Sequence, residues 1–256
     1  MIPYLELPAV RLGPLNIHPF GMFTSLAVLS GVWYTKRIAQ REMQAGETLL
    51  DMTPWFLFPG FLGTHFASLA FYYPQAFRDG NFWTFVNVTS GLSSFGGSFA
   101  GALEAYLFIR RHNLPFLPWL DVLARGFSLS YVFSRAGCTA AHDHPGLPAD
   151  FFLAMAYPAR DGFPAGPRHD LGFYEFLPWV AIFLLFYWLS RRRRPEGFFT
   201  GLMIVWYLPL RFGLDFLRVN DLTYFGLTFA QWCCFLVFPL GIVILARALH
   251  GVVNLA

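Results

Sequence analysis

The chain has 256 residues, of which 56% are hydrophobic, 20% aromatic and only 13% charged. Soluble domains are about 25% charged, so this composition favours a polytopic membrane protein built as one membrane-embedded unit. The net charge of +3 comes without a basic tract interleaved with aromatic residues, which excludes nucleic acid as a partner.

Seven segments are long and apolar enough to cross a bilayer, which takes roughly 20 residues each. They cover residues 17–35, 54–73, 91–109, 118–134, 173–190, 198–217 and 227–246. The fourth segment is the weakest candidate, because Asp121 and Arg125 interrupt it. We therefore expect an all-α polytopic membrane protein with seven transmembrane helices, in which residues 1–256 form a single domain embedded in the lipid bilayer.

Basic residues gather at alternate ends of these segments. Ten of the eighteen Lys and Arg residues follow the first, third, fifth and seventh segments: Lys36, Arg37, Arg41, Arg110, Arg111, residues 191–194, and Arg247. Positive charge favours the cytoplasmic side, so we expect the N-terminus outside and the C-terminus inside. Residues 74–89 then form an outer loop, and residues 142–172 form a small extracytoplasmic head. Within the head, the apolar stretch 150–159 suits a strand pair or an interfacial segment.

The stretch YVFSRAGCTAAHDHPG, residues 131–146, places several ionisable groups where the fourth apolar segment ends. Such groups are costly in lipid and by default indicate a functional site. Arg135 on its own would also suit an interfacial arginine whose head reaches water. Cys138 suits either a packing residue or a nucleophile that the nearby arginine favours as thiolate.

A second arginine lies deep in the sixth segment, within WYLPLRFGLDFLR. Arg211 has Asp215 and Arg218 on its own helix face, four and seven residues further on. We expect Asp215 to pair with Arg211 and Arg218 to stay free near the headgroup level. Because guanidinium groups match phosphate oxygens, Arg135 and Arg211 suggest a clamp for a phospholipid phosphate, with structural pairing as the alternative.

Three further stretches carry candidate groups. On an extended segment His142 and His144 would face one way and Asp143 the other, which suits a general acid or base, a two-histidine metal edge, or simple loop polarity. The sequence fixes no third ligand, so we expect no metal ion or other cofactor. The stretch HDLGFYE at 169–175 could order the clamp, move protons or start a helix. The small-residue run 91–101 suits either helix packing or close approach to a ligand.

The chain resembles the prolipoprotein diacylglyceryl transferase family, whose signature after the fourth span reads G-R-x-G-N-F-x-N-x-E-x-x-G. Here the stretch is SRAGCTAAHDHPG: Arg135, Gly137 and Gly146 match, and Asp143 replaces the glutamate. The resemblance extends from His18 to about residue 231.

Four shorter motifs of the family are also similar. Its H-P-x-Q-L-Y-E corresponds to His169, Tyr174 and Glu175, and its Y-x-x-F-R-x-x-x-E-x-x-R corresponds to Tyr207, Arg211, Asp215 and Arg218. Its H-G-G corresponds to Phe95, Gly96 and Gly97, and its H-W-Y-G to residues 18–21.

The resemblance implies an enzyme of the bacterial inner membrane with its active site on the extracytoplasmic side. Phosphatidylglycerol would be held by its phosphate on Arg135 and Arg211, and its diacylglyceryl group would pass to the lipobox cysteine of a preprolipoprotein signal peptide. The catalytic candidates are Arg135, Arg211, His142, Asp143 and His144. The substrate-binding candidates are Gly96, Gly97, Gly137, Cys138, Gly146, His169, Tyr174, Glu175, Tyr207, Asp215 and Arg218.

Four polar positions of the family pattern are exchanged here. The two signature asparagines are Cys138 and Ala141, the histidine of the third span is Phe95, and the tyrosine of the first is Phe20. Either residues 142–144 have taken over proton transfer, or the clamp remains while the acceptor or the reaction has changed. The alternatives to the transferase are therefore a related membrane enzyme with the same lipid donor, or a non-catalytic lipid- or lipoprotein-binding homologue.

Overall fold

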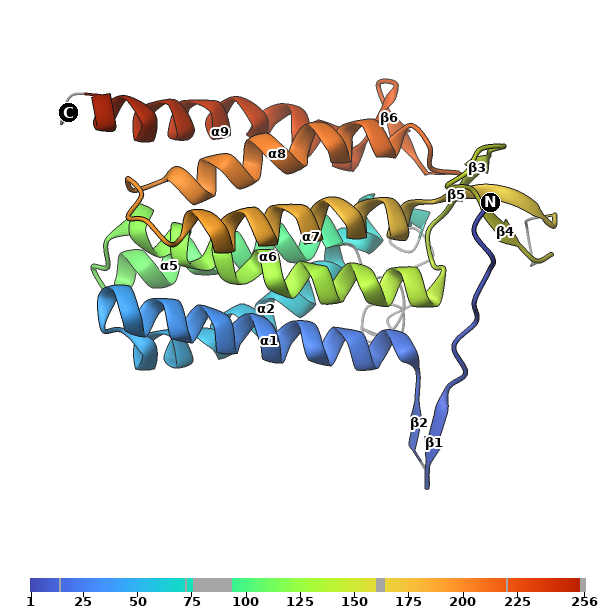
Figure 1. Ribbon diagram of the computed structural model, residues 1–256, viewed down its shortest axis with the longest axis horizontal. Coiled ribbons are helices and arrows are strands. Elements are labelled where there is room, and N and C mark those ends of the chain that lie inside the picture. The colour runs from blue at the N-terminus through green and yellow to red at the C-terminus, as the bar shows by residue number, and fades with distance from the viewer. Residues whose placement is uncertain (14, 72, 76–93, 160–163, 220, 254–256) are drawn as a thin grey trace.

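The computed structural model describes residues 1–13, 15–71, 73–75, 94–159, 164–219 and 221–253, and most of these are helical (Figure 1). The seven helices among them are α1 (Pro19–Met43), α2 (Gly46–Phe71), α5 (Ser94–Arg111), α6 (Phe116–Ala141), α7 (Leu171–Leu189), α8 (Phe198–Asp215) and α9 (Phe229–Val253). Each predicted apolar segment falls largely on one helix. Residues 91–93 and most of the predicted loop 74–89 lie outside the described residues.

The outer surface of the bundle is apolar. Leu29 on α1, Leu184 on α7 and Leu236 on α9 are 67%, 57% and 69% exposed. By length and composition alone, α7 and the part Phe229–His250 of α9 are the two described helices that could cross a membrane. A mostly helical chain with large apolar side chains turned outward agrees with the expected all-α membrane protein.

Helix α6 lies at the centre of the packing. It packs against α1 on one side and α7 on another, while α2 pairs with α5 and α8 pairs with α9. The five helices α1, α6, α7, α8 and α9 run nearly parallel to the long axis of the molecule, with the small strands gathered at one end (Figure 1). We call this the head end, where α6 ends and α7 begins, and the opposite end the basic end.

The two charged residues that weaken the fourth segment fasten helices together at the basic end. Arg125 donates to both carboxylate oxygens of Glu42, each at 2.6 Å. The Asp121 carboxylate accepts the backbone N–H groups of Gly197 and Thr200, both at 2.8 Å, where α8 begins. Both charges are satisfied, as buried charges must be.

The head end carries a three-stranded antiparallel sheet in the order β3-β5-β4, formed by Pro145–Pro148, Gly166–Asp170 and Met155–Tyr157. The stretch 150–159, expected to form a strand pair or an interfacial segment, supplies the single strand β4. Ile2 extends this sheet, because its N–H donates to the Ala154 carbonyl at 2.8 Å. The chain then forms a hairpin of β1 (Val10–Leu12) and β2 (Leu15–Ile17), and a further hairpin of β6 (Thr223–Tyr224) and β7 (Leu227–Thr228) precedes α9.

Candidate active site

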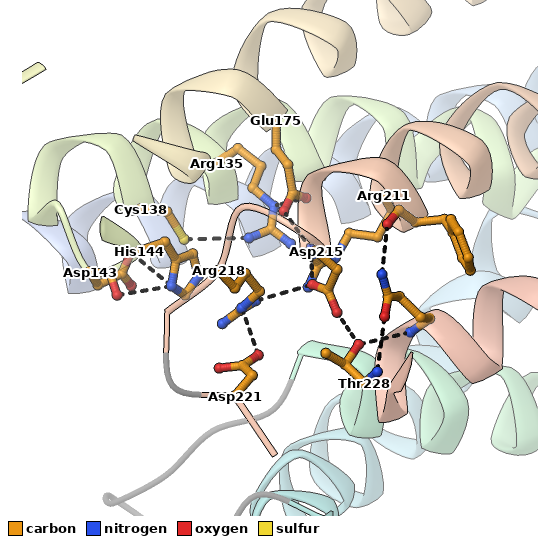
Figure 2. A network of polar contacts seen from close by, with 12 residues as sticks. Arg135, Cys138, Asp143, His144, Glu175, Arg211, Asp215, Arg218, Asp221 and Thr228 are labelled. Carbon is orange, nitrogen blue, oxygen red and sulfur yellow. Dashed lines mark hydrogen bonds and ion pairs between the residues drawn. The ribbon is translucent and has the colours of Figure 1, made fainter. Parts of the chain in front are cut away.

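Glu175, in the second turn of α7, is the centre of a buried ionic cluster at the head end (Figure 2). Its Oε2 lies 3.1 Å from Nε of Arg135 on α6, and its Oε1 lies 3.7 Å from a terminal nitrogen of Arg211 on α8. All three side chains are at least 96% buried. The two arginines proposed from the sequence therefore converge on one carboxylate, which joins three helices.

Two tyrosines complete the surroundings of Arg135. The Tyr207 hydroxyl donates to Glu175 Oε2 at 2.8 Å. Arg135 donates to the Tyr131 hydroxyl at 3.3 Å, and its guanidinium carbon lies 4.9 Å from the centroid of the same ring. Aromatic rings attract cations placed over their faces, so the orientation of the guanidinium is fixed from two sides.

Asp215 is the second buried carboxylate of the cluster. Its Oδ1 lies 2.6 Å from a terminal nitrogen of Arg211, one helical turn away, which confirms the predicted pair. Its Oδ2 accepts a hydrogen bond from the hydroxyl of Thr228, which stands at the start of α9. Asp215 thus links α8 to α9 at the head end.

The expectation that Arg218 stays free is wrong. Its Nε forms an ion pair with Asp221 at 2.8 Å, and a terminal nitrogen lies 3.8 Å from Asp215. Asp221 lies three residues further on, beyond the end of α8, and this local spacing was a signal that the sequence already contained. The Arg218 side chain is 21% exposed, so it is more accessible than those of Arg135 and Arg211.

The predicted extended arrangement of residues 142–144 is also wrong. His142 ends α6 in a left-handed conformation, with φ of 49°. Its Nδ1 lies 2.9 Å from Asp170, its Nε2 lies 3.1 Å from the Leu5 carbonyl, and Tyr4 stacks on its ring. Both ring nitrogens are engaged in the head, so His142 does not join His144.

The residues that do come together are Cys138, Asp143 and His144, whose ligand atoms all lie within 4.8 Å of one another. Burial raises the pKa of the Asp143 carboxyl to about 6, against the opposing effect of Arg135. Burial lowers the pKa of His144 to about 3, and the charges of Arg135 and Arg218 act in the same direction. Near neutral pH, Asp143 is therefore a carboxylate and His144 is uncharged.

The same trio is the only group of three potential metal ligands of this kind among the described residues. A sulfur, a nitrogen and an oxygen donor are acceptable to a zinc ion. However, a terminal nitrogen of Arg135 lies 3.7 Å from the Cys138 sulfur, so a positive charge already occupies that side. The donor set with its cationic neighbour fits proton transfer better than metal binding.

His169 and Tyr174 brace the head against α7. His169 Nδ1 lies 3.2 Å from the Tyr174 hydroxyl, which donates to the Leu153 carbonyl at 3.2 Å. Burial lowers the pKa of His169. Asp170, between the head and α7, accepts the backbone N–H of Phe173 at 2.8 Å and so caps the helix that carries Glu175.

The candidate glycines stand where backbone segments come close. A Cβ on Gly146 would lie 2.8 Å from the Leu217 carbonyl oxygen, where the head pairs with the end of α8. A Cβ on Gly137 would lie 2.9 Å from Phe23 on α1. Cβ atoms on Gly96 and Gly97 would lie 2.2 Å and 2.5 Å from Ala67 and Thr64 on α2, which supports the packing interpretation of the small-residue run.

Sequence reasoning missed several residues that hold this site. Tyr131, Tyr157 and Thr228 all bond to members of the cluster or of the head. Asp170 lies in the stretch 169–175, and its cap on the Phe173 N–H bears out the expectation that this stretch could start a helix. The contact between Tyr131 and Arg135 joins residues four apart on α6, a local spacing that indicates it, whereas the other two contacts join separate segments.

The chain is similar to known proteins over most of its length. The family model of the prolipoprotein diacylglyceryl transferases matches residues 8–247. The phosphatidylglycerol–prolipoprotein diacylglyceryl transferase of Nitratidesulfovibrio vulgaris strain Miyazaki F is 31% identical, over 96% of this chain and 94% of its own. The enzymes of the same name from Chromohalobacter salexigens and Pseudomonas fluorescens strain Pf-5 are each 29% identical, over 86% and 91% of this chain and 81% and 91% of their own. The chain belongs to the prolipoprotein diacylglyceryl transferase family.

Proposed function

We propose that this protein transfers the diacylglyceryl group of phosphatidylglycerol to the lipobox cysteine of a preprolipoprotein. Family membership and the names of the relatives support the reaction. The observation that carries the proposal is the convergence of Arg135 and Arg211 on Glu175, in a buried cluster beside the head. This arrangement provides the guanidinium groups that a phosphate leaving group requires.

The geometry favours a phosphate position between Arg135 and Arg218. Arg135 uses its Nε for Glu175, while one terminal nitrogen has the Cys138 sulfur, at 3.7 Å, as its hydrogen-bond partner among the described residues. Sulfur is a weak hydrogen-bond acceptor, so a phosphate oxygen can replace it at little cost. Arg218 is partly exposed and lies on the same side as His144, where a headgroup could enter.

Transfer then requires one bond to form and one to break. The acceptor sulfur bonds to the glyceryl carbon that carries the phosphate, and the electron pair of the broken C–O bond leaves with glycerol phosphate. Arg135 and Arg218 stabilise the charge that develops on the leaving phosphate, and Arg211 adds its positive charge from its paired position on α8. The acceptor thiol loses its proton as it attacks, and Asp143 is the best-placed base, because it is a carboxylate near pH 7 while His142 is bonded into the head.

Glu175 and Asp215 act in this scheme as positioning residues. Each buried carboxylate holds Arg211 at one oxygen, and Glu175 also holds Arg135. A buried guanidinium without a partner would turn toward water or destabilise the fold. The two carboxylates therefore hold Arg135 and Arg211 inside the bundle before the substrate binds.

The membrane arrangement that fits this chemistry has seven spans and an extracytoplasmic site. The residues 1–256 would form one domain of the bacterial inner membrane, with the head 142–172 and the N-terminus outside. Support comes from the basic residues at the ends of α1, α5 and α7, opposite the buried cluster. Alkaline phosphatase fused after residue 159 should be active, and a fusion after Arg193 should be inactive.

Purified full-length protein provides the test of the reaction. Phosphatidylglycerol labelled in its acyl chains is mixed with a lipobox peptide, and label on the peptide is measured together with released glycerol phosphate. We expect equal amounts of both products, none with a peptide whose cysteine is serine, and none with Arg211→Ala. Release of glycerol phosphate without labelled peptide would favour a different acceptor. Lipid binding without turnover would favour a non-catalytic homologue.

A further inference from the structure

A second polar region lies at the basic end, away from the ionic cluster. A cavity of about 840 Å³ opens between α1 and α7, with part of α6 behind it. On α7 its residue Tyr187 is twelve positions from Glu175, or about 18 Å along the helix axis at 1.5 Å per residue. A volume of this size matches sites for small ligands.

The cavity is strongly cationic. Its lining contains one carboxylate, Glu42, and five basic side chains: Lys36, Arg37, Arg41, Arg125 and Arg191. Glu42 is held by Arg125 through both oxygens, and Lys36 pairs with Glu47 at 3.0 Å. Within the described part of the chain, the remaining three arginines form no ion pair with a carboxylate. An anion would complete this site.

Aromatic rings hold two of these arginines in place. The Arg37 guanidinium carbon lies 4.5 Å from the ring centroid of Trp33, and that of Arg191 lies 5.9 Å from the ring of Tyr187. Ser190 also lines the cavity. A preorganised pair of guanidinium groups matches the oxygens of a phosphate.

The surroundings indicate which phosphate is bound. On α1 the apolar Leu29 stands one turn before Trp33, which is one turn before Arg37. On α7 Leu184 stands about one turn before Tyr187, and Arg191 follows four residues later, just past the end of the helix. Leu29, Leu184, Trp33 and Tyr187 are all more than half exposed. In both segments an apolar side chain, an aromatic ring and an arginine thus follow one another along the axis. These match the depths of the acyl chain, the membrane interface and the headgroup of a phospholipid.

We propose that this cavity binds the phosphate of an anionic phospholipid in the leaflet at the basic end, independently of the transfer reaction. The tendency of basic residues to face the cytoplasm does not by itself explain the cavity. Arg192 and Arg193 belong to the same arginine run as Arg191 but do not line it, and Arg110 on α5 does not line it either. The basic residues at this membrane face are therefore of two kinds, those that line the cavity and those that do not.

The test uses full-length protein in detergent, titrated with dioleoyl phosphatidic acid and followed by native mass spectrometry. The cavity variant is Arg37→Gln with Arg191→Gln. Its matched control, Arg110→Gln with Arg193→Gln, loses the same charge at the same end, and Arg110 also lies over an aromatic ring, that of Tyr106. We expect roughly tenfold weaker lipid binding for the cavity variant and less than about twofold for the control. Phosphatidylcholine should bind both alike.

Three results would overturn the proposal. Equal weakening in both variants would mean that only the general charge of the surface attracts the lipid. Unchanged binding in the cavity variant would exclude the cavity. Displacement of the lipid by millimolar glycerol phosphate would assign the site to a soluble phosphate. Transferase activity of both variants, measured in parallel, should stay at the level of the unmodified protein and shows that they are folded.

Discussion

Helix α6 carries two buried arginines, and they are held in different ways. Arg125, at the basic end, donates from both terminal nitrogens to the two carboxylate oxygens of Glu42, whose side chain is 40% exposed. Arg135, at the head end, meets the buried Glu175 through Nε, and its terminal nitrogens contact a tyrosine hydroxyl and a sulfur. We call the two terminal nitrogens of an arginine its fork. The fork of Arg125 is filled by a carboxylate, whereas the fork of Arg135 contacts a hydroxyl and a sulfur, which are weaker acceptors.

This difference indicates how a buried arginine can be both stable and available. A fork that already holds a carboxylate gains little from a phosphate, because the two acceptors have the same geometry. An arginine that is neutralised from its Nε side keeps its fork for a ligand. We infer that Glu175 is placed to compensate the charge of Arg135 without competing for its binding face.

The largest expected effect separates these two arginines by function. Arg135→Ala should lower kcat/KM for phosphatidylglycerol about 1000-fold, as removal of a transition-state donor does elsewhere. Arg125→Ala removes an equally buried arginine from the same helix, and should reduce stability while kcat/KM per folded molecule changes less than about threefold. Radiolabel transfer to a lipobox peptide measures both. A large loss in kcat/KM for Arg125→Ala would show that the two arginines do not differ in function.

The carboxylate partners should differ in the same direction. Glu175→Gln leaves Arg135 without its buried counter-charge and weakens the hold on Arg211, which should cost about 3–5 kcal/mol of stability. Glu42→Gln removes a partly exposed partner, and we expect about 1 kcal/mol or less. Thermal unfolding in detergent, followed by near-ultraviolet circular dichroism, measures both. Equal losses would mean that Glu175 is not the main counter-charge of the cluster.

The pH dependence of the transfer tests the role of Asp143. Because burial raises the pKa of this carboxyl to about 6, it is protonated and inactive as a base below that pH, so kcat/KM should rise through pH 6 and level off above pH 7. Asp143→Asn should lower activity about 100-fold and abolish this rise. The control His142→Phe affects the head but not the base, so its pH profile should keep the same midpoint. An unchanged profile in Asp143→Asn would exclude Asp143 as the base.

Much of the helical framework could be predicted because apolar length and charge are local properties of the sequence. The Arg211–Asp215 pair was predictable for the same reason, since residues four apart on a helix are neighbours. The free state predicted for Arg218 is wrong because its partner Asp221 lies just beyond α8.

The features that were wrongly predicted or not predicted depend on tertiary contacts. His142 was expected on an extended segment, but α6 continues to Ala141 and ends on His142 in a left-handed turn that directs its ring toward Asp170. Ile2 joins the head sheet across more than 150 residues of chain, a pairing that no local pattern indicates. That one carboxylate, Glu175, lies between two arginines of other helices likewise depends on how the bundle packs.

The smallest expected effect concerns the weak partner of Arg135. Asparagine at position 138, as in the family signature, offers an amide oxygen, which accepts a hydrogen bond from a guanidinium more strongly than sulfur does. The phosphate must displace this partner, so Cys138→Asn should raise KM for phosphatidylglycerol about threefold with kcat nearly unchanged. Cys138→Ala leaves the fork of Arg135 open and should leave KM equal or lower. Loss of turnover in Cys138→Ala would instead make the thiol a nucleophile, and the fork of Arg135 would then serve to activate sulfur and not to receive phosphate.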